Sequence, residues 1–486
     1  MPYEAIRYVS AWTTAVLRAE PARRAEGLTQ CLWGDWVGVE SLAATDGWLR
    51  VRTRGRSGWL REQDIGATRP LEVNFVDIGQ GDGTFVVAPD DSMFIIDAGQ
   101  GDNMHRFLRW RFNLSGSRQA PPIEAAVISH PDLDHYKGFQ RIFADQRFRF
   151  NTVYHNGIVE RAGGDALGAS EVVDGQRYLT ELVQDRDTLE QLLAEPERRG
   201  RKLYPKLMWT ALESGRVADI RMAAAGDVIF ATDENGTHLE MRVLAPVLEE
   251  VDGSPALRWF ADKPGPTRSG NAGKTKNGHS VVTMLQYGNV RILLGGDLNI
   301  PAEEYLMAHY GHDTTEFQAD VAKACHHGSP DFSTQFLDLV NPVATVISSG
   351  DDEPHGHPRA DTLGTVGKHS RGERSLIFST ELARSAPERI TSATRARAAI
   401  LRLLDNVVEA ADDVARSTAR GKFTEHLAKV VQRSVSMYGL ITLRTDGTRA
   451  ILAQRLERAR SKTQKWDVYE LKPDGNGTLS YTSPHH

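Results

Sequence analysis

From Leu71 onward the chain carries short apolar runs that stop abruptly at Gly, Asp or His. Examples are Thr84-Phe-Val-Val-Ala88, Met93-Phe-Ile-Ile-Asp97, Val290-Arg-Ile-Leu-Leu-Gly-Gly-Asp297 and Ala344-Thr-Val-Ile-Ser-Ser-Gly350. Short apolar runs bounded by turn residues are typical of buried strands. The pattern therefore predicts strands that deliver the polar residues following them, among them Asp77, Asp82 and Asp97, to loops at one edge of a sheet.

Residues 1–69 have a different pattern, in which shorter runs alternate with Gly and Asp turns. The predicted strands are Cys31-Leu-Trp33, Trp36-Val-Gly-Val39, Trp48-Leu-Arg-Val51 and Gly58-Trp-Leu60. Regular short strands with frequent turns are typical of a small barrel. Together with Leu17-Arg-Ala-Glu-Pro21, these segments resemble bacterial SH3 domains, and the resemblance implies a protein partner for this unit.

Three later regions complete the predicted organisation. Residues 156–235 are polar and helix-rich, which predicts an insertion that forms a wall of a cleft. Residues 384–436 predict a second helical insertion, in which Ile400, Leu404, Val407, Ala411 and Val414 follow the spacing of one buried helical face. Residues 437–486 predict a closing β-hairpin with its turn at Asp446-Gly447.

Composition narrows the class of protein. The 486 residues are 40% hydrophobic and 25% charged, as in ordinary globular proteins. No uncharged apolar run approaches the roughly 20 residues that span a bilayer, and the start, Met-Pro-Tyr-Glu, lacks the pattern of a signal peptide. These features predict a cytoplasmic protein without a membrane partner.

Charge and cysteine content exclude two further classes. The net charge of −6 argues against a protein covered in nucleic acid, although it leaves room for a local basic groove. Cys31 and Cys325 lie far apart and indicate no disulfide framework.

The strongest chemical signal is Val127-Ile-Ser-His-Pro-Asp-Leu-Asp-His-Tyr-Lys-Gly138, an apolar run that ends in four metal-ligand residue types. Residues two apart on an extended segment point the same way, so His130 and Asp132 can hold one ion while the following turn brings Asp134 and His135 toward a second. An Asp-rich turn that caps a helix near Tyr136 is the alternative, but capping accounts for only one carboxylate.

The order of motifs resembles the metallo-β-lactamase superfamily, and within it the hydrolase domain of competence-type DNA-uptake channels (ComEC-like). The motifs are Ile78-Gly-Gln-Gly-Asp82, the His-x-Asp-x-Asp-His cluster at His130, Gly-Gly-Asp297, His326-His-Gly-Ser329 and Gly-His357-Pro358. They cover about Leu71 to Ala383. The resemblance implies a four-layer αββα sandwich for residues 70–383, without the membrane helices of those channels.

The resemblance also implies a site of two divalent ions, Zn²⁺ or Mn²⁺. His130, Asp132 and His279 would bind one ion, Asp134, His135 and His326 the other, and Asp297 both; Asp134 could instead orient a shared hydroxide. ComEC-like sequences often have Asn near position 279. Asp97 and Asp82 would support the ligands from behind.

The remaining predicted roles concern substrate. His327 and His357 are candidates for catalysis beside Asp134, and Ser329 is a candidate phosphate contact. Lys274 and Lys276 lie in a Gly- and Lys-containing loop that could contact phosphate, although a disordered loop has the same composition.

These features predict a two-metal phosphodiester hydrolase, because paired ions activate water and neutralise phosphoryl charge. A nuclease acting on DNA is the first hypothesis. A phosphodiesterase for a small molecule, such as a cyclic nucleotide or a phosphocholine-type ester, is the second. A partner-binding module that keeps the fold without activity is the third.

Overall fold

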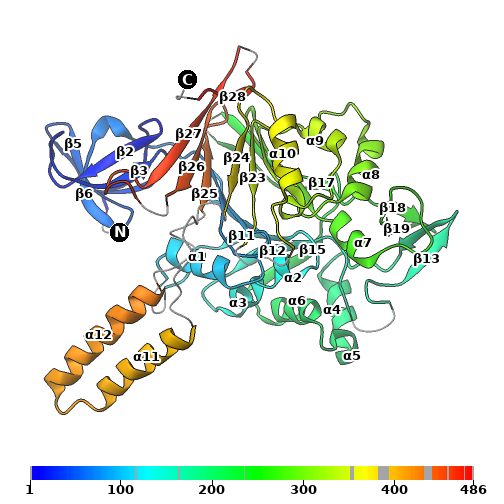
Figure 1. Cartoon of the computed structure of the whole chain (residues 1–486), viewed down its shortest axis with the longest axis horizontal. Coiled ribbons are helices and arrows are strands. Elements are labelled where there is room, and N and C mark those ends of the chain that lie inside the picture. Colours follow the sequence, from blue (N-terminus) through cyan, green and yellow to red (C-terminus); the bar gives the residue numbers. More distant parts are fainter. Residues whose placement is uncertain are drawn as a thin grey trace.

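A computed structural model describes the chain except residues 1–2, 115–117, 162–164, 235, 351–354, 381–392, 432–439, 457–458, 476 and 484–486. Two large sheets lie face to face in its centre, with helices outside each of them (Figure 1). Parts of the predicted insertion 384–436 fall outside the described residues.

The first large sheet has ten strands among the described residues. In spatial order they are β15 (Val217–Met222), β12 (Phe150–His155), β11 (Ile123–Ile128), β10 (Met93–Ile96), β9 (Thr84–Val87), β8 (Leu71–Phe75), β25 (Ile441–Thr445), β26 (Ala450–Arg455), β27 (Trp466–Pro473) and β28 (Leu479–Tyr481). The C-terminal strand β25 pairs antiparallel with β8, which joins the last part of the chain to the start of the sandwich. Two strands beyond the predicted hairpin extend the same sheet.

The second large sheet has seven strands in the part of the chain that the structure describes. Their order is β16 (Val228–Glu234), β17 (Thr237–Ala245), β20 (Val282–Tyr287), β21 (Val290–Leu294), β22 (Val321–Lys323), β23 (Ala344–Ile347) and β24 (Leu376–Ser379). Strands β21 to β24 run parallel to one another, so the loops that follow them gather at one edge.

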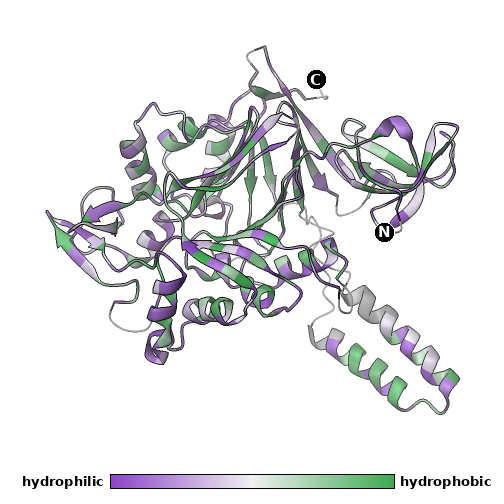
Figure 2. Ribbon diagram, turned by 180° about the vertical axis from the view of Figure 1, so that it is seen from behind, coloured by the Kyte–Doolittle hydropathy of each residue, from purple (hydrophilic) through white to green (hydrophobic). Residues whose placement is uncertain are grey.

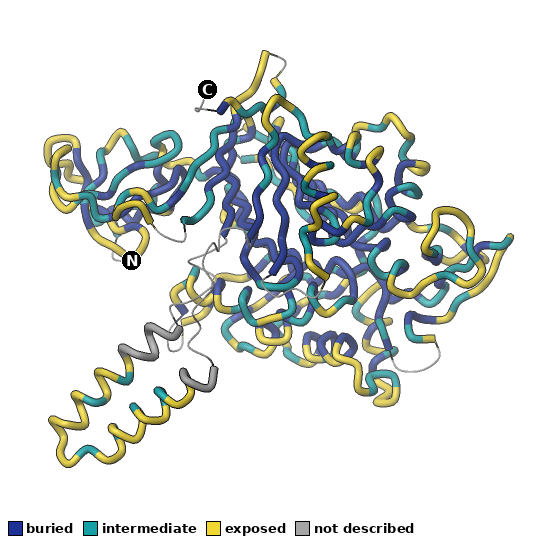
Figure 3. Tube along the Cα trace, viewed as in Figure 1, coloured by how far each residue is buried: buried dark blue, intermediate teal, exposed yellow. Residues whose placement is uncertain are grey.

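Strand β11 shows why the sheets are covered on both sides. Ala126 and Ile128 belong to the core under the helices, whereas Ala125 and Val127 belong to the core between the two sheets. Alternate residues of a strand point to opposite faces, so an uninterrupted apolar run satisfies both cores at once. Figure 3 shows strands in the centre of the molecule that are buried along most of their length.

Helices complete the outer layers. Those over the ten-stranded sheet are α1 (Asn103–Arg111), α3 (Phe139–Ala144), α4 (Arg186–Ala194) and α6 (Leu203–Glu213), with the short α2 (Leu133–Tyr136) and α5 (Pro196–Arg199) beside them. Those over the seven-stranded sheet are α8 (Ile300–Tyr310) and α9 (Thr334–Val340), accompanied by α7 (Ala272–Gly278) and α10 (Ala360–His369). This helix–sheet–sheet–helix order confirms the predicted αββα sandwich.

The region 156–235 is less helical than its composition predicts. Besides α4, α5 and α6 it holds β13 (Ser170–Val173) and β14 (Gln176–Leu179), which form a small sheet with β18 (Glu249–Val251) and β19 (Ser254–Arg258). Its strands β15 and β16 belong to the two large sheets. These segments form strands because they pair with strands that are distant in sequence. The spacing of apolar residues within one segment does not predict such pairing.

An all-β unit precedes the sandwich, as predicted. Its strands are ordered β3 (Gly27–Leu32), β2 (Thr14–Arg18), β6 (Arg56–Arg61), β5 (Trp48–Thr53), β4 (Trp36–Thr45), β1 (Ala5–Val9) and β7 (Ile65–Gly66), with a 3₁₀ turn at Glu62–Asp64. Leu17, Cys31 and Val51 lie in its own small core. The SH3-like identity of this unit and its protein partner stay predictions.

A helical hairpin formed by α11 (Ala393–Val408) and α12 (Asp413–Val431) extends away from the sandwich (Figures 1 and 3). The prediction of one continuous buried face was wrong, because the chain turns after Val408 and Val414 belongs to the second helix, where it is exposed. Leu404 is also exposed, and the apolar positions of α11 stand out in Figure 2.

Candidate metal centre

The predicted ligands meet where loops from the edges of both sheets come together. His130 follows β11, Asp297 follows β21, and His326 and His327 lie in a 3₁₀ turn (Cys325–Gly328) after β22. Because neighbouring parallel strands end at one edge, segments nearly 200 positions apart in sequence share one site. Asp82, His135, Asp297 and His327 offer donor atoms that all lie within 4.8 Å of one another.

The centre of this cluster is the carboxylate of Asp297. Its Oδ2 atom lies 3.2 Å from Nε2 of His135, 3.3 Å from Nε2 of His327, and 3.9 Å from Nε2 of both His130 and His326. Asp297 is buried, and its Oδ1 accepts no hydrogen bond from the described residues. Four imidazole nitrogens therefore face one carboxylate.

Hydrogen bonds fix the orientation of the His130 ring. The Ser129 hydroxyl donates to Asp97 (2.6 Å) and the Ser280 hydroxyl donates to the carbonyl of Asn277 (2.8 Å). Both hydroxyl oxygens lie near Nδ1 of His130, at 3.1 and 3.2 Å, and can only accept from it. The proton is therefore on Nδ1, which leaves the lone pair of Nε2 directed at the cluster.

His135 is oriented in a similar way by Asp97. Asp97 Oδ2 lies 2.8 Å from Nδ1 of His135, and Asp97 Oδ1 accepts from the backbone N–H of Ser129 (2.8 Å). A carboxylate behind a metal-binding imidazole is a common arrangement, since it fixes the tautomer and makes the ring a better ligand. Asp97 has the position predicted for a supporting residue.

Asp82 and a buried lysine occupy the far side of the cluster. Asp82 Oδ1 lies 3.1 Å from Nδ1 of His327, and Oδ2 pairs with Nζ of Lys323. Lys323 also donates to the carbonyl of Gly296 (2.8 Å). Nδ1 of His327 also lies 3.1 Å from the carbonyl oxygen of Ser348. Asp82 Oδ1 accepts no hydrogen bond from the described residues, so Asp82 could contact an ion as well as orient His327. Lys323 was missed, although a lysine between buried alanines in a strand was a visible signal.

The residues fit a divalent metal ion. Nε2 of His130 is fully buried and has no hydrogen-bond partner among the described residues, although a buried polar atom without a partner is costly. Imidazole nitrogen and carboxylate oxygen are donors that suit zinc and manganese. His130, His135, Asp297 and His327 are thus the residues that could hold the metal.

The carboxylates of the cluster favour positive charge on two of its histidines. Although burial alone raises the pKa of Asp297, His135 and His327 hold that pKa well below its ordinary value. Burial lowers the pKa of His327, but the carboxylates of Asp297 and Asp82 outweigh it and raise the pKa to about 10. Protons thus occupy a site whose negative charge would also favour a metal ion, and metal binding would release them.

The structure does not bring His279 into this cluster. Its Nε2 donates to the carbonyl of Arg258 (2.7 Å), and its ring lies against Phe260 with centroids 4.7 Å apart. Burial lowers its pKa to about 4. The neighbouring Ser280 contacts Nδ1 of His130 instead. The prediction of His279 as a ligand was therefore wrong.

The two histidines after β22, His326 and His327, have the reverse of their predicted roles. Both have left-handed backbone angles, with φ of 50° at His326 and 55° at His327. This sharp turn directs buried His327 into the four-residue cluster, while His326 remains at the rim, partly exposed. His327, predicted for catalysis, has the geometry of a ligand, and His326 lies beside it toward solvent.

Asp132 and Asp134 lie on the open side of the cluster. Asp132 Oδ2 is 3.7 Å from Nε2 of His130, while its Oδ1 pairs with Lys276. Asp134 Oδ2 is 3.6 Å from Nε2 of His327 and accepts from Gln80 (3.4 Å). Both carboxylates are within reach of an ion at the cluster.

A cleft of about 660 Å³ opens over these residues. Its lining includes Asp132, Asp134, Asp297, His326, His327, His355, His357, Lys276, Glu160, Arg201 and Lys202. The predicted contacts Lys276 and His357 therefore face the cleft. Lys274 and Ser329 do not line it: Lys274 pairs with Asp331, and the Ser329 hydroxyl accepts from the N–H of Asp331 (3.2 Å).

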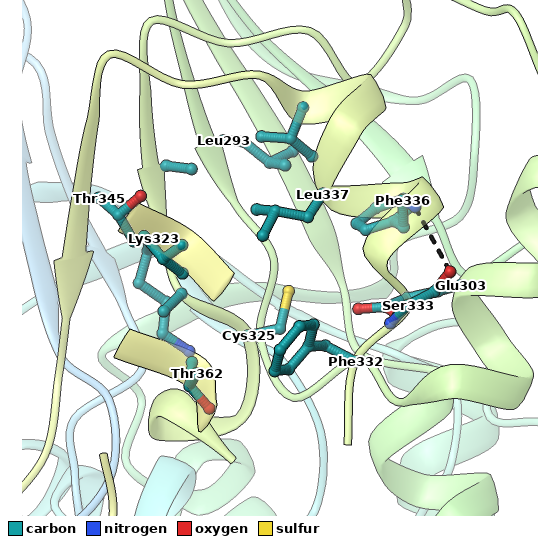
Figure 4. A pocket seen from close by; sticks show the side chains of 14 residues that line it. Leu293, Glu303, Lys323, Cys325, Phe332, Ser333, Phe336, Leu337, Thr345 and Thr362 are labelled. Carbon is teal, nitrogen blue, oxygen red and sulfur yellow. Dashed lines mark hydrogen bonds between the residues drawn. The ribbon is translucent and has the colours of Figure 1, made fainter. Parts of the chain in front are cut away.

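A second, smaller cavity lies behind the cluster between β22, α8 and α9 (Figure 4). It measures about 50 Å³ and its walls are largely apolar, with the thiol of Cys325 and the carboxyl of Glu303 among them. Burial raises the pKa of Glu303 to about 8. This cavity lacks the histidines and carboxylates of the metal centre, so we do not regard it as the catalytic site.

No family model matches this chain. The chain is 26% identical to ComE operon protein 3 of Bacillus subtilis over 301 aligned residues, and this aligned region is 62% of the chain. It spans only 31% of the length of that relative. No helix among the described residues is both long and apolar enough to cross a bilayer.

Solved structures give weaker similarity. Zn²⁺-bound PqqB from Methylobacterium extorquens aligns with a TM-score of 0.33 and 11% identity, over 62% of this chain and 85% of that protein. A protein described as a metal-dependent hydrolase from Parabacteroides distasonis aligns with a TM-score of 0.29 and 10% identity, over 64% of this chain and 93% of that protein.

Proposed function

We propose that this chain is a metal-dependent phosphodiester hydrolase that acts on DNA. The observation that carries the proposal is the convergence of four imidazole Nε2 atoms on Oδ2 of Asp297, at the floor of an open cleft. A divalent ion held by this donor set supplies a coordinated water of lowered pKa and neutralises charge on phosphoryl oxygens.

The proposed ligand set follows the distances. His130 and Asp132 would hold one ion, His135 and His327 the other, and Asp297 would contact both. Asp134 and His326 lie within 4 Å of the cluster and would complete it on the side of the cleft. We propose that the site holds two ions, either Zn²⁺ or Mn²⁺.

The residues of the chain itself would bind and orient the substrate. Lys276 lies beside Asp132 in the wall of the cleft, where its ammonium can contact a phosphoryl oxygen. The ring of His357 lies 5.7 Å from that of His326, and both line the cleft. An imidazole at this place can hold a proton for the departing oxygen, which is the role proposed for His357.

The lining also bears on the alternatives. A phosphocholine-type ester carries a quaternary ammonium, which proteins bind in cages of aromatic rings. Besides its histidines, the described lining has Tyr136 as its one aromatic side chain, and it has Arg201, Lys202 and Lys276 as cations. Cations repel such a substrate, so a cyclic nucleotide is the stronger small-molecule candidate. A module without activity is disfavoured because four histidines and Asp297 remain together at the cleft.

Purified protein loaded with Mn²⁺ or Zn²⁺ tests the proposal with single-stranded DNA, duplex DNA and a cyclic dinucleotide. We expect cleavage of DNA, and its loss in Asp297→Asn. The matched control is Asp313→Asn, which changes an exposed aspartate after α8. Cleavage of the cyclic dinucleotide alone would contradict DNA as the substrate, and no cleavage of any phosphodiester would overturn the hydrolase itself.

A further inference from the structure

One wall of the cleft is formed by the segment between β12 and β15. Arg201, Lys202 and Leu203, which lead into α6, line the same cleft as Asp132 and Asp297. No motif in the sequence marks these residues, and the ComEC-like resemblance does not assign them a role. Their place in the fold nevertheless puts two cations beside the metal centre.

Ion pairs connect this wall to the metal ligands. Lys276 pairs with Asp132 and lies 3.8 Å from Oε1 of Glu160, and Lys202 lies 3.1 Å from the same oxygen. Arg201 is exposed and makes no ion pair within the described part of the chain. Three cations thus accompany two carboxylates here, and Arg201 is the cation that these ion pairs leave over.

Two exposed leucines line the same cleft, one next to Asp132 in the chain and one next to Lys202. Leu133 at the start of α2 is 43% exposed and Leu203 at the start of α6 is 41% exposed, and both line the cleft. Sites for single-stranded nucleic acid combine a positive groove for the backbone with side chains, usually aromatic, that stack on the bases. Apolar side chains also pack against bases that enter an active-site pocket. The lining of this cleft contains both cations and exposed apolar side chains.

We propose that Arg201 and Lys202 form a subsite for the phosphate next to the scissile one, with Leu133 and Leu203 in contact with the nucleoside between the two phosphates. This inference rests on the proposed phosphodiester hydrolase and specifies its substrate as a nucleic-acid strand with at least two phosphates. A substrate with a single phosphate would leave the subsite empty.

The test compares two substrates that differ in this respect. Bis(p-nitrophenyl) phosphate has one phosphate, whereas in a labelled single-stranded DNA dodecamer each scissile phosphate has at least one neighbouring phosphate. The variant is Arg201→Ala/Lys202→Ala. The control is Arg109→Ala/Lys206→Ala, which removes one arginine and one lysine that are exposed and outside the cleft.

We expect the variant to lower the ratio of kcat/KM for the dodecamer to kcat/KM for the diester about tenfold, mainly through KM, because a lost phosphate contact weakens binding of the strand. The dependence of log kcat/KM on log salt should become shallower by about 0.7, as for one phosphate contact on a single strand. The control should leave both quantities unchanged.

Equal losses on both substrates, or an unchanged ratio and salt dependence, would overturn the subsite while leaving the hydrolase intact. A wild-type protein that hydrolyses the diester but not the dodecamer would also overturn it. A wild-type protein that hydrolyses neither substrate would overturn the proposed function first, so the two failures are distinguishable.

Discussion

At the scale of single residues, the site depends on hydrogen bonds that lie behind the ligands. Ser129 and Ser280 use their protons on Asp97 and on the carbonyl of Asn277, so each can only accept from His130. The two serines were not predicted. Serine is common in loops, and only the folded structure shows that these hydroxyls touch a ligand ring.

Asp97→Asn tests this support directly. The amide loses one of the two acceptor oxygens that hold Ser129 and His135, and we expect metal affinity to fall about 10- to 100-fold. The backbone should remain in place, because φ at residue 97 is 56° and Asn tolerates this region. Affinity is measured by competition with a chromophoric chelator.

The control for this variant is Asp102→Asn, since Asp102 pairs with Arg106 at the surface. A full-affinity Asp97→Asn protein would show that His135 needs no carboxylate behind it.

Glu303 provides a prediction on stability. Its pKa is raised from 4.5 to about 8 by burial, so the folded protein binds a proton that the unfolded chain releases above pH 4.5. The contribution of this proton to the free energy of unfolding should therefore be fully present below pH 4.5. It should decrease by up to about 1.4 kcal/mol per pH unit as the pH rises toward 8. Glu303→Gln should remove this decline.

Chemical denaturation of both proteins between pH 5 and about 9 measures the effect. Parallel curves for wild type and Glu303→Gln would mean that Glu303 is ionised in the fold.

At the scale of elements, the site needs two loops in very close contact. Gly81 lies in the turn between β8 and β9 with φ of 102°, and a Cβ atom there would lie 1.7 Å from the carbonyl oxygen of Asp134. The backbone N–H of Asp82 donates to the same oxygen (3.2 Å). The Gly-Gln-Gly-Asp turn thus positions both Asp82 and the loop that carries Asp134.

Gly81→Ala should therefore separate these loops. We expect a loss of metal affinity of at least tenfold together with a lower melting temperature, because both strain and overlap oppose the native turn. Gly47→Ala is the control, since its φ is also positive at 77° but no atom lies within 4 Å of the added Cβ. Equal effects of the two substitutions would mean that backbone strain alone explains the loss.

The elements also show what sequence can and cannot predict. The apolar runs that become β9, β10, β21 and β23 were recognised because each is buried on both faces. The strands of the region 156–235 were not, since β15 and β16 pair with partners distant in sequence. His279 was mistaken for a ligand for a similar reason. The sequence motif identifies the loop that approaches the site, but α7 ends at His279 and the next residue, Ser280, contacts His130.

At the scale of the whole molecule, a buried ion network joins the N-terminal unit to the sandwich. Arg444 on β25 lies 2.9 Å from Oδ1 of Asp35 and 3.7 Å from Oε2 of Glu72, and it donates to the carbonyl of Trp33. Arg54 pairs with Asp35 as well. The sequence pattern predicted the all-β unit but not this junction, because the partners lie up to 411 positions apart.

Arg444→Met should lower the free energy of unfolding by about 3–5 kcal/mol, because it leaves buried Asp35 and Glu72 without one of their cations. Urea denaturation followed by tryptophan fluorescence measures the loss. Arg460→Met is the control, since Arg460 is 61% exposed and its pair with Asp467 should contribute less than about 1 kcal/mol. A similar small effect at both positions would mean that the junction contributes little to stability.

The most direct test of the central claim is anomalous X-ray diffraction from crystals of the protein grown with Mn²⁺. The account predicts manganese density bounded by Nε2 of His130, Nε2 of His135, Nε2 of His327 and the carboxylate of Asp297. Crystals in which these side chains remain in direct contact with one another, with manganese bound elsewhere or not at all, would contradict it.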